Sequence, residues 1–214
     1  MPRRPRNSHR REPAKRIAPP TIHLFSEGKN TEPDYLRAVL AKHAKGTKIL
    51  RIHGPNGVAH SVASAAVSFA QENGLIKARR RRKLNSYEER DQVWAVFDRD
   101  DDEVSRYAEA KKVCEDAGLN YAYSDPCFEH WINLHFEMCD APCDRHQAQK
   151  RTKELIADYD PKSGKTADFS DIVEACDEAE ERAKTQQNRR EEEGDQEGNP
   201  STTVFKLTEI LRAR

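Results

Sequence analysis

The stretch Gln92-Val-Trp-Ala-Val-Phe-Asp-Arg-Asp100 decides the fold class of this chain. Its apolar part is rich in β-branched and aromatic residues, which makes it the most strand-like stretch of the chain. The strand ends abruptly at Asp98. Because successive strand side chains point to opposite faces, we expect Asp98 and Asp100 to point one way, about 7 Å apart, and Arg99 the other way.

Strands and helices alternate on both sides of this stretch. The predicted order is strand 21–28, a helix beginning at Asn30 or Thr31, strand 48–53, helix 58–73, strand 92–97, helix 103–117, strand 120–124 and helix 128–136. Such alternation predicts an α/β fold with a mainly parallel sheet, here of four strands flanked by helices.

Composition divides the chain into three parts. Charged residues make up 35% of it, and Lys+Arg 37 balance Asp+Glu 37. Residues 1–20 are rich in Arg and Pro and are predicted to be a disordered basic tail. Residues 21–140 hold most of the apolar runs and are predicted to be the folded core. Residues 141–214 are predicted to be a polar helical extension of the same domain, with a terminal helix from about Thr202.

The short apolar stretches, the N-terminal sequence and the number of cysteines together predict a cytoplasmic protein. No apolar stretch is long enough to cross a bilayer, and no apolar region follows the N-terminal arginines as it does in a secretory signal. Five cysteines are an odd number, which indicates reduced thiols rather than a disulfide framework.

Two of the predicted strands end in acidic residues. Glu27 follows the first strand, and Asp98 and Asp100 follow the third. Carboxyl ends of parallel strands meet at one edge of a sheet, where ligands bind. Carboxylates gathered there repel one another, and a hard divalent cation relieves that repulsion. The alternative is that residues 98–102 form a solvated loop that caps the next helix.

Four motifs, in order along the chain, together resemble the RloB family. They are Ser-Glu-Gly-Lys-Asn-Thr-Glu-Pro (26–33), Val-Phe-Asp-Arg-Asp (96–100), Ser-Asp-Pro-Cys-Phe-Glu-His-Trp (124–131) and Asn-Pro-Ser-Thr-Thr-Val (199–204). That family includes AbiLii-like proteins of phage abortive infection, and its core resembles the Rossmann-like TOPRIM fold. The resemblance implies that Glu27, Asp98 and Asp100 hold Mg²⁺ or Mn²⁺ as the catalytic residues.

The same resemblance implies a metal-dependent nuclease of anti-phage defence, which acts on DNA or RNA beside an AAA/ABC-type ATPase (RloA- or AbiLi-like). One departure is Asp125, where the motif leads us to expect Asn; it adds negative charge near the site. Two alternatives remain open. One is a non-catalytic subunit that binds nucleic acid or an effector, and the other is transferase chemistry on nucleic acid.

Further residues are candidates for supporting roles at this site. Asp102 and Glu129 are candidates for additional metal ligands, whereas Glu32 is expected to contribute little. Lys29 and the basic run Arg79–Lys83 are candidates for binding the phosphate backbone, although each is also typical of a solvated surface. The run consists of Arg79, Arg80, Arg81, Arg82 and Lys83.

Two other patterns are weaker. His135, Cys139, Cys143 and His146 have a spacing that could bind zinc, but the usual close Cys pair is missing and coincidence is the preferred interpretation. Ser163–Thr166 resembles the end of a phosphate-binding loop, yet Tyr159 stands where that loop needs its first Gly and no strand precedes it, so ATP binding is rejected.

Overall fold

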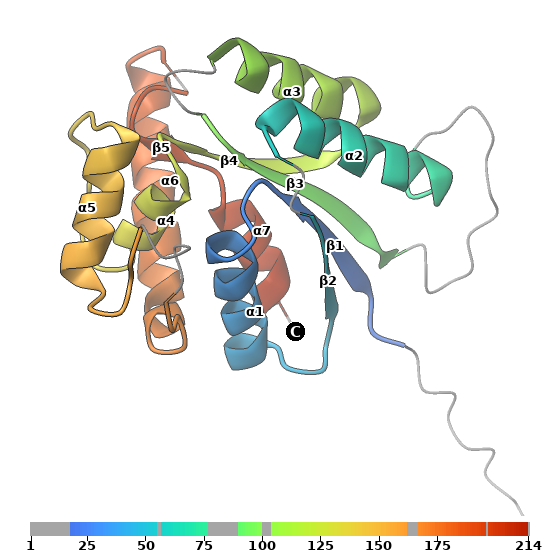
Figure 1. The fold of residues 1–214 in the computed structure, drawn as a ribbon, viewed down its shortest axis with the longest axis horizontal. Coiled ribbons are helices and arrows are strands. Elements are labelled where there is room, and N and C mark those ends of the chain that lie inside the picture. Colours follow the sequence, from blue (N-terminus) through green and yellow to red (C-terminus); the bar gives the residue numbers. More distant parts are fainter. Residues whose placement is uncertain are drawn as a thin grey trace, which may run out of the picture.

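A five-stranded, mostly parallel sheet forms the centre of the molecule (Figure 1). The computed structural model describes residues 18–54, 57–76, 90–99, 104–161, 167–195 and 197–213. The strands are β1 (Thr21–Ser26), β2 (Ile49–His53), β3 (Gln92–Asp98), β4 (Asn120–Asp125) and β5 (Ser201–Thr202). Their order across the sheet is β2-β1-β3-β4-β5. The α/β fold class with a parallel core is therefore confirmed.

The fifth strand was not predicted. β5 pairs antiparallel with β4, and Ser124 lies opposite Thr202. Two polar residues carry no strand periodicity, so only the pairing with β4 reveals this strand. The terminal helix accordingly begins at Phe205 rather than near Thr202.

Seven α-helices and one short 3-10 helix surround the sheet in the described part of the chain. They are α1 (Thr31–His43), α2 (Ala59–Glu72), α3 (Val104–Ala117), α4 (Phe128–Asn133), α5 (Arg145–Leu155), η3 (Ile172–Ala175), α6 (Cys176–Glu192) and α7 (Phe205–Arg212). Helix α4 ends three residues before the predicted end at Phe136, because the backbone then continues in turns. All five cysteines are free.

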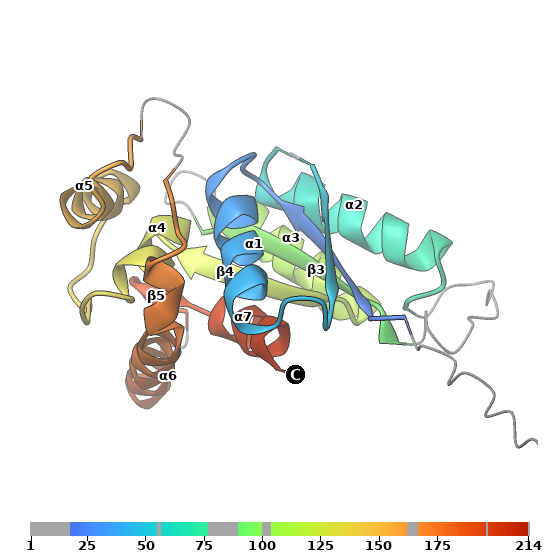
Figure 2. The same ribbon diagram turned by 90° about the horizontal axis from the view of Figure 1, so that it is seen from below.

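The helices cover both faces of the sheet, and strand alternation explains how (Figure 2). On β3, Trp94 and Val96 join the core cluster shared with α1, α4, α6 and α7. Val93, Ala95 and Phe97 join the other cluster, shared with α2 and α3. A strand covered on both faces needs a nearly continuous apolar run, which is what the 92–97 stretch supplies.

The C-terminal part completes the core rather than standing apart from it. Leu207 and Leu211 of α7 are fully buried in the cluster that contains α1. Between these apolar contacts, the buried Glu180 of α6 accepts hydrogen bonds from Thr208 (2.8 Å) and Arg212 (2.7 Å) of α7. A polar sequence can thus form a packed helical layer, because its few apolar residues share one face and its buried charge is paired.

The strand order also creates a switch point in the sheet. The chain runs from β1 to β2 on one side, and then crosses back over β1 to reach β3 on the other. Connections that leave two neighbouring strands in opposite directions open a crevice at their carboxyl ends, the usual ligand site of such sheets. In this molecule the crevice lies after Ser26 and Asp98.

Candidate functional site

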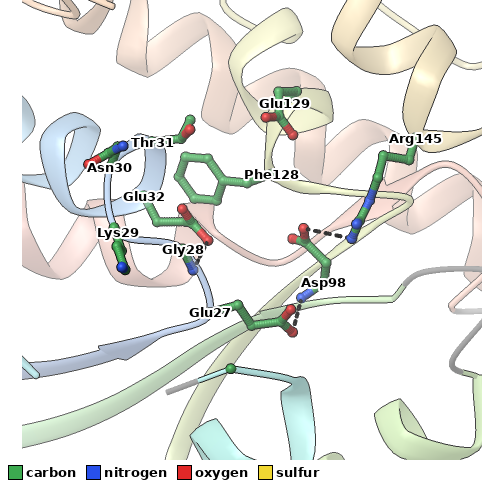
Figure 3. A pocket seen from close by; sticks show the side chains of 11 residues that line it. Glu27, Gly28, Lys29, Asn30, Thr31, Glu32, Asp98, Phe128, Glu129 and Arg145 are labelled. Carbon is green, nitrogen blue, oxygen red and sulfur yellow. Dashed lines mark hydrogen bonds and ion pairs between the residues drawn. The ribbon is translucent and has the colours of Figure 1, made fainter. Parts of the chain in front are cut away.

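A cavity of about 230 Å³ lies at this switch point, and four carboxylates line it (Figure 3). Glu27 follows β1, and Asp98 ends β3. Glu32 belongs to the first turn of α1, and Glu129 belongs to α4. Three distant parts of the chain therefore bring four like charges to one small space.

Glu27 and Asp98 are joined directly across the two strands. The Asp98 backbone N–H donates to Glu27 Oε1 over 3.1 Å. This bond lies just beyond the last backbone pair of the parallel strands β1 and β3. It orients the Glu27 carboxylate toward the end of β3 (Figure 3). The structure thus brings together two of the three residues predicted to be catalytic.

Glu32 is a site residue to which the sequence analysis assigned no role. The residue is 6% exposed, and its carboxylate accepts a hydrogen bond from the Gly28 N–H over 3.1 Å. A Cβ at position 28 would collide with that carboxylate, so the glycine permits the close approach. An acid early in α1 therefore folds back over the end of β1 and lines the cavity, while the expectation that Glu32 contributes little to function stays a prediction.

Glu129 is buried at the inner wall of the cavity. It is 2% exposed, and Tyr159 Oη donates to its Oε1 over 2.6 Å. A buried carboxylate is costly unless it is hydrogen-bonded, and the tyrosine contributes part of that compensation. The proximity of Glu129 to this cavity agrees with its candidacy as a further acidic ligand. Tyr159 was not singled out for this position.

Arg145 also lines the cavity, and the sequence analysis did not single it out. It is the first residue of α5, and its Nη2 lies 3.6 Å from Asp98 Oδ2. Figure 3 shows the guanidinium reaching across the cavity to that carboxylate. Nothing in the local sequence separates Arg145 from the chain's many other basic residues, because its role depends on how α5 packs.

Crowding of negative charge changes the acidity of Asp98. Burial raises the pKa of this carboxyl well above its usual value, and the charges of Glu27, Glu32 and Glu129 add to the effect, while Arg145 opposes it. The buried thiol of Cys127 next to α4 has its pKa raised, first by burial and then by Glu129 and Asp98. Burial is the larger cause of both raised pKa values, and the neighbouring carboxylates of the cavity add to it.

The remaining predicted site residues divide into two groups. Lys29 lines the cavity and is exposed, as a phosphate-binding lysine or a surface lysine would be. Asp100, Asp102 and the run Arg79–Lys83 lie outside the described residues. Their predicted roles stay predictions.

Asp125, the last residue of β4, is not among the residues that line this cavity. Its carboxylate, nearly fully buried, pairs with Arg99 (3.1 Å) and accepts from Asn199 Nδ2 (2.5 Å). Arg99 also donates to the backbone carbonyl of Glu197. The negative charge of Asp125 is therefore neutralised by Arg99 and does not add to the acidic cavity. These contacts tie the ends of β3 and β4 to the segment before β5.

The zinc pattern does not form a cluster in the described residues. His135 is buried and lies 2.8 Å from Tyr35 Oη, with Trp131 and Ile132 carbonyls at its other ring nitrogen. Burial lowers its pKa to about 4. The imidazole is therefore a neutral, hydrogen-bonded part of the core. Residues 162–166, where the rejected phosphate-loop pattern falls, lie outside the described residues.

The donor set of the cavity fits a hard cation in its chemistry. Carboxylate oxygens are the ligands preferred by Mg²⁺ and Mn²⁺, and their mutual repulsion is relieved by a positive ion. Within the described ranges, no three of these side chains converge closely enough to hold an ion as they stand. Glu27 and Asp98 are the residues that would hold it, with Glu32 and Glu129 close by.

Fold and site together define an α/β protein with an acidic cavity at the switch point of a Rossmann-like sheet. The chain belongs to the RloB-like protein family, whose model matches residues 22–211. The match spans both the sheet and the C-terminal helices. No curated protein and no solved structure matches the chain. None of the helices in the described residues is both long and apolar enough to cross a membrane.

Proposed function

We propose that this chain is a divalent-metal-dependent nuclease that hydrolyses phosphodiester bonds of DNA or RNA in anti-phage defence. The observation that carries the proposal is the junction of Glu27 and Asp98 at the switch point, with two further buried carboxylates beside it. Four carboxylates in one cavity are costly in a protein that binds only phosphate, since they repel that ligand. They favour a site in which a cation lies between protein and phosphate.

The chemistry divides between the ion and the side chains. A bound divalent cation supplies Lewis-acid activation of the phosphate and a water of lowered pKa. Glu27 accepts the proton of the attacking water as the new P–O bond forms, and the sugar oxygen whose bond to phosphorus breaks takes up a proton from solvent. The Asp98 N–H holds the Glu27 carboxylate in place for this transfer. Lys29 and Arg145, at the rim and wall of the cavity, attract the phosphate oxyanions.

Membership of the RloB-like family supports the defence role. The placement of Glu27 beside Asp98, which resembles that of the acids in TOPRIM proteins, supports the use of Mg²⁺ or Mn²⁺. We further propose that the chain works beside an AAA/ABC-type ATPase, which would couple ATP hydrolysis to activation. Asp100 completes the proposed acidic triad.

Glu27→Gln tests this function. The change keeps the size of the side chain and its hydrogen bond from the Asp98 N–H, but removes the charge and the basicity. We expect cleavage of DNA or RNA to fall by roughly a hundredfold or more, as when a general base is lost. Binding of nucleic acid should persist or tighten, because repulsion falls. Phage protection in cells that contain the ATPase should be lost.

Glu72→Gln is the matched control, since Glu72 is exposed at the end of α2 and does not line the cavity. It should leave cleavage and protection unchanged. Full cleavage by the Glu27 variant would exclude the proposed mechanism. Binding of nucleic acid without any cleavage by the unaltered protein, with Mg²⁺ or Mn²⁺ present, would favour a non-catalytic binding subunit instead.

A further inference from the structure

A buried tyrosine holds Glu129 from the protein interior. Glu129 lines the acidic cavity, and Figure 3 shows its carboxylate pointing into that space. Tyr159 Oη donates to Glu129 Oε1 over 2.6 Å, although Tyr159 itself is not among the residues that line the cavity. The tyrosine is 1% exposed and belongs to the hydrophobic core cluster shared with α1, α4, α6 and α7. The hydroxyl therefore contacts the carboxylate from the core side.

The position of the tyrosine hydroxyl is fixed by the structure around it. Tyr159 follows α5 in a turn, and its backbone N–H donates to the carbonyl of Ile156 over 3.1 Å. Helix α5 is in turn joined to α4. Thr152 of α5 donates to Asn133 Oδ1 at the end of α4 over 2.9 Å, and Asn133 donates to a backbone carbonyl of α5 over 3.1 Å. The helix that carries Glu129 and the helix that leads to Tyr159 therefore pack as one unit.

The length of the bond between Tyr159 and Glu129 indicates an ionised acceptor. A hydroxyl group that donates to a carboxylate anion does so over about 2.5–2.7 Å, which is shorter than the usual distance between neutral groups. An ionised carboxylate can only accept, so the proton on this bond is that of the tyrosine. Such a donor stabilises the charged form of the carboxylate and limits its rotation.

The stability of the core does not explain this pair. Glu129 and Tyr159 are both almost fully buried. Removing a carboxylate from water costs more free energy than one hydrogen bond returns, so two apolar side chains of similar size would stabilise the core as well or better. The arrangement is instead typical of metal sites, in which the carboxylates that hold the ion are oriented by hydrogen bonds from a second layer of groups.

We propose that Tyr159 is a positioning residue of the metal site. Its hydroxyl holds the Glu129 carboxylate toward the cavity, where Glu129 adds its negative charge to that of Glu27 and Asp98 in binding a divalent cation. This inference rests on the proposed function and deepens it, because it assigns a role to Glu129 and to a residue that never touches the ion. The metal site then extends from the strand ends into the core beside α4 and α5.

A purely structural role of Tyr159 leads to a different expectation. A tyrosine that only packs the core affects metal affinity no more than any other buried tyrosine hydroxyl does. A tyrosine that acts through Glu129 affects metal affinity only while position 129 carries a carboxylate. A double-mutant cycle separates the two roles, because the effects of two residues that act as a pair are not additive.

The experiment measures the Mn²⁺ affinity of the full chain by calorimetry, without nucleic acid. The variants are Tyr159→Phe, Glu129→Gln and the double variant. Tyr35→Phe is the matched control, because Tyr35 is fully buried in the same core cluster and does not line the cavity. Its hydroxyl lies 2.8 Å from His135 Nε2. Thermal unfolding in EDTA verifies that each variant is folded.

For Tyr159→Phe we expect Mn²⁺ to bind roughly tenfold more weakly, as when a hydrogen bond that orients a ligand is lost. Glu129→Gln should weaken binding roughly tenfold or more, because a negative charge of the site is gone. The affinity of the double variant should lie within about twofold of that of Glu129→Gln alone. Tyr35→Phe should lower the Tm in EDTA, since it also removes a buried hydroxyl, but should leave Mn²⁺ affinity within about twofold of that of the unaltered protein.

An unchanged Mn²⁺ affinity in Tyr159→Phe or in Glu129→Gln would overturn the inference. Equal losses of affinity in Tyr159→Phe and Tyr35→Phe would also overturn it, and so would a loss in the double variant that is the full sum of the two single losses.

Cleavage of DNA and RNA by the unaltered protein is assayed in parallel with Mn²⁺ present. The expected pattern of affinities in a protein that cleaves neither would overturn the nuclease function and leave the role of Tyr159 standing. Cleavage without that pattern would overturn the role of Tyr159 alone. Failure of the unaltered protein to bind Mn²⁺ would overturn both.

Discussion

At the scale of single residues, the site is governed by charge that folding forces together. Asp98 ends the most apolar strand of the molecule, and the carboxylates of Glu27, Glu32 and Glu129 lie around it. Each of these acids has an ordinary local setting: a strand end, a turn of helix, a helix start. Only their convergence makes the site unusual, because an ionised side chain is well solvated at the surface but destabilises the folded protein in a crowded, half-buried cavity.

The metal-free protein should therefore gain stability from Asp98→Asn. The pKa of Asp98 is raised by folding, so the native state holds its proton to higher pH than the unfolded chain does. Stability consequently falls as pH rises from the usual pKa of the carboxyl through its raised folded value, and the variant lacks this fall. In EDTA, the Tm advantage of Asp98→Asn should be small at acidic pH and grow toward neutral pH, at roughly 2–4 °C per kcal/mol for a chain of this size.

Added Mn²⁺ should reverse that order. The unaltered protein should gain Tm as metal binds the native state, and Asp98→Asn should gain much less, with or without Asp100→Asn. Thermal unfolding in EDTA and in Mn²⁺, over a series of pH values, measures both effects. A variant that is less stable than the unaltered protein in EDTA at neutral pH would show that the charge of Asp98 is fully compensated by its neighbours.

At the scale of elements, the two ends of the folded chain depend on each other. Helix α7 packs against α1, the helix that carries Glu32 and follows Glu27, and β5 extends the sheet beyond β4. The buried carboxylate of Asp125 pairs with Arg99 and accepts a hydrogen bond from Asn199, and these contacts fix the segment that leads into β5. The C-terminal segment therefore supports the side of the cavity that α1 and α4 form.

Leu211→Ala should reveal this dependence. Leu211 is fully buried in α7, so truncation removes apolar packing and leaves a cavity, at a cost of about 2–5 kcal/mol in the free energy of unfolding. Ile210→Ala, at the partly buried neighbouring position, should cost clearly less. Urea unfolding followed by circular dichroism measures both. Equal, small losses would mean that α7 is not part of the cooperative unit.

At the scale of the whole molecule, a net charge of zero conceals strong segregation of charge. Lys+Arg and Asp+Glu are equal in number, yet the cavity is acidic, and basic residues gather in the N-terminal tail and in the run Arg79–Lys83. An acidic cavity repels nucleic acid at long range. If the chain acts on nucleic acid as proposed, that ligand has to be attracted by positive charge elsewhere on the molecule, and the basic run is the leading candidate.

Replacing Arg79–Lys83 by glutamines should weaken binding of nucleic acid and flatten its salt dependence. For every phosphate group that the variant no longer neutralises, the slope of log affinity against log salt should fall by about 0.7–0.9. The fold should survive, as we expect these side chains to be solvated. Anisotropy titrations over a salt series measure the slope, and circular dichroism monitors folding. An unchanged slope would place the path of the nucleic acid elsewhere.

The sequence by itself determined the parallel core and the place of its acidic edge. The 92–97 run is the most strand-like of the chain, and its apolar residues continue without alternation, as they do in a strand covered on both faces. The positions of Glu27 and Asp98 at strand ends followed from where such runs stop. These are local properties of the chain, encoded by the composition and hydrophobic periodicity of a few residues. They can therefore be predicted without knowledge of the tertiary contacts.

Tertiary structure decided the rest of the site. Arg145 meets Asp98 only because α5 is bound to α4, and Tyr159 meets Glu129 only in the packed core. Glu32 turns inward because Gly28 leaves room for it. Strand β5 exists because β4 offers an edge to pair with. Such interactions join residues far apart in the chain, and no local pattern encodes them, since their energy comes from burial and charge pairing that arise once the helices have packed on the sheet.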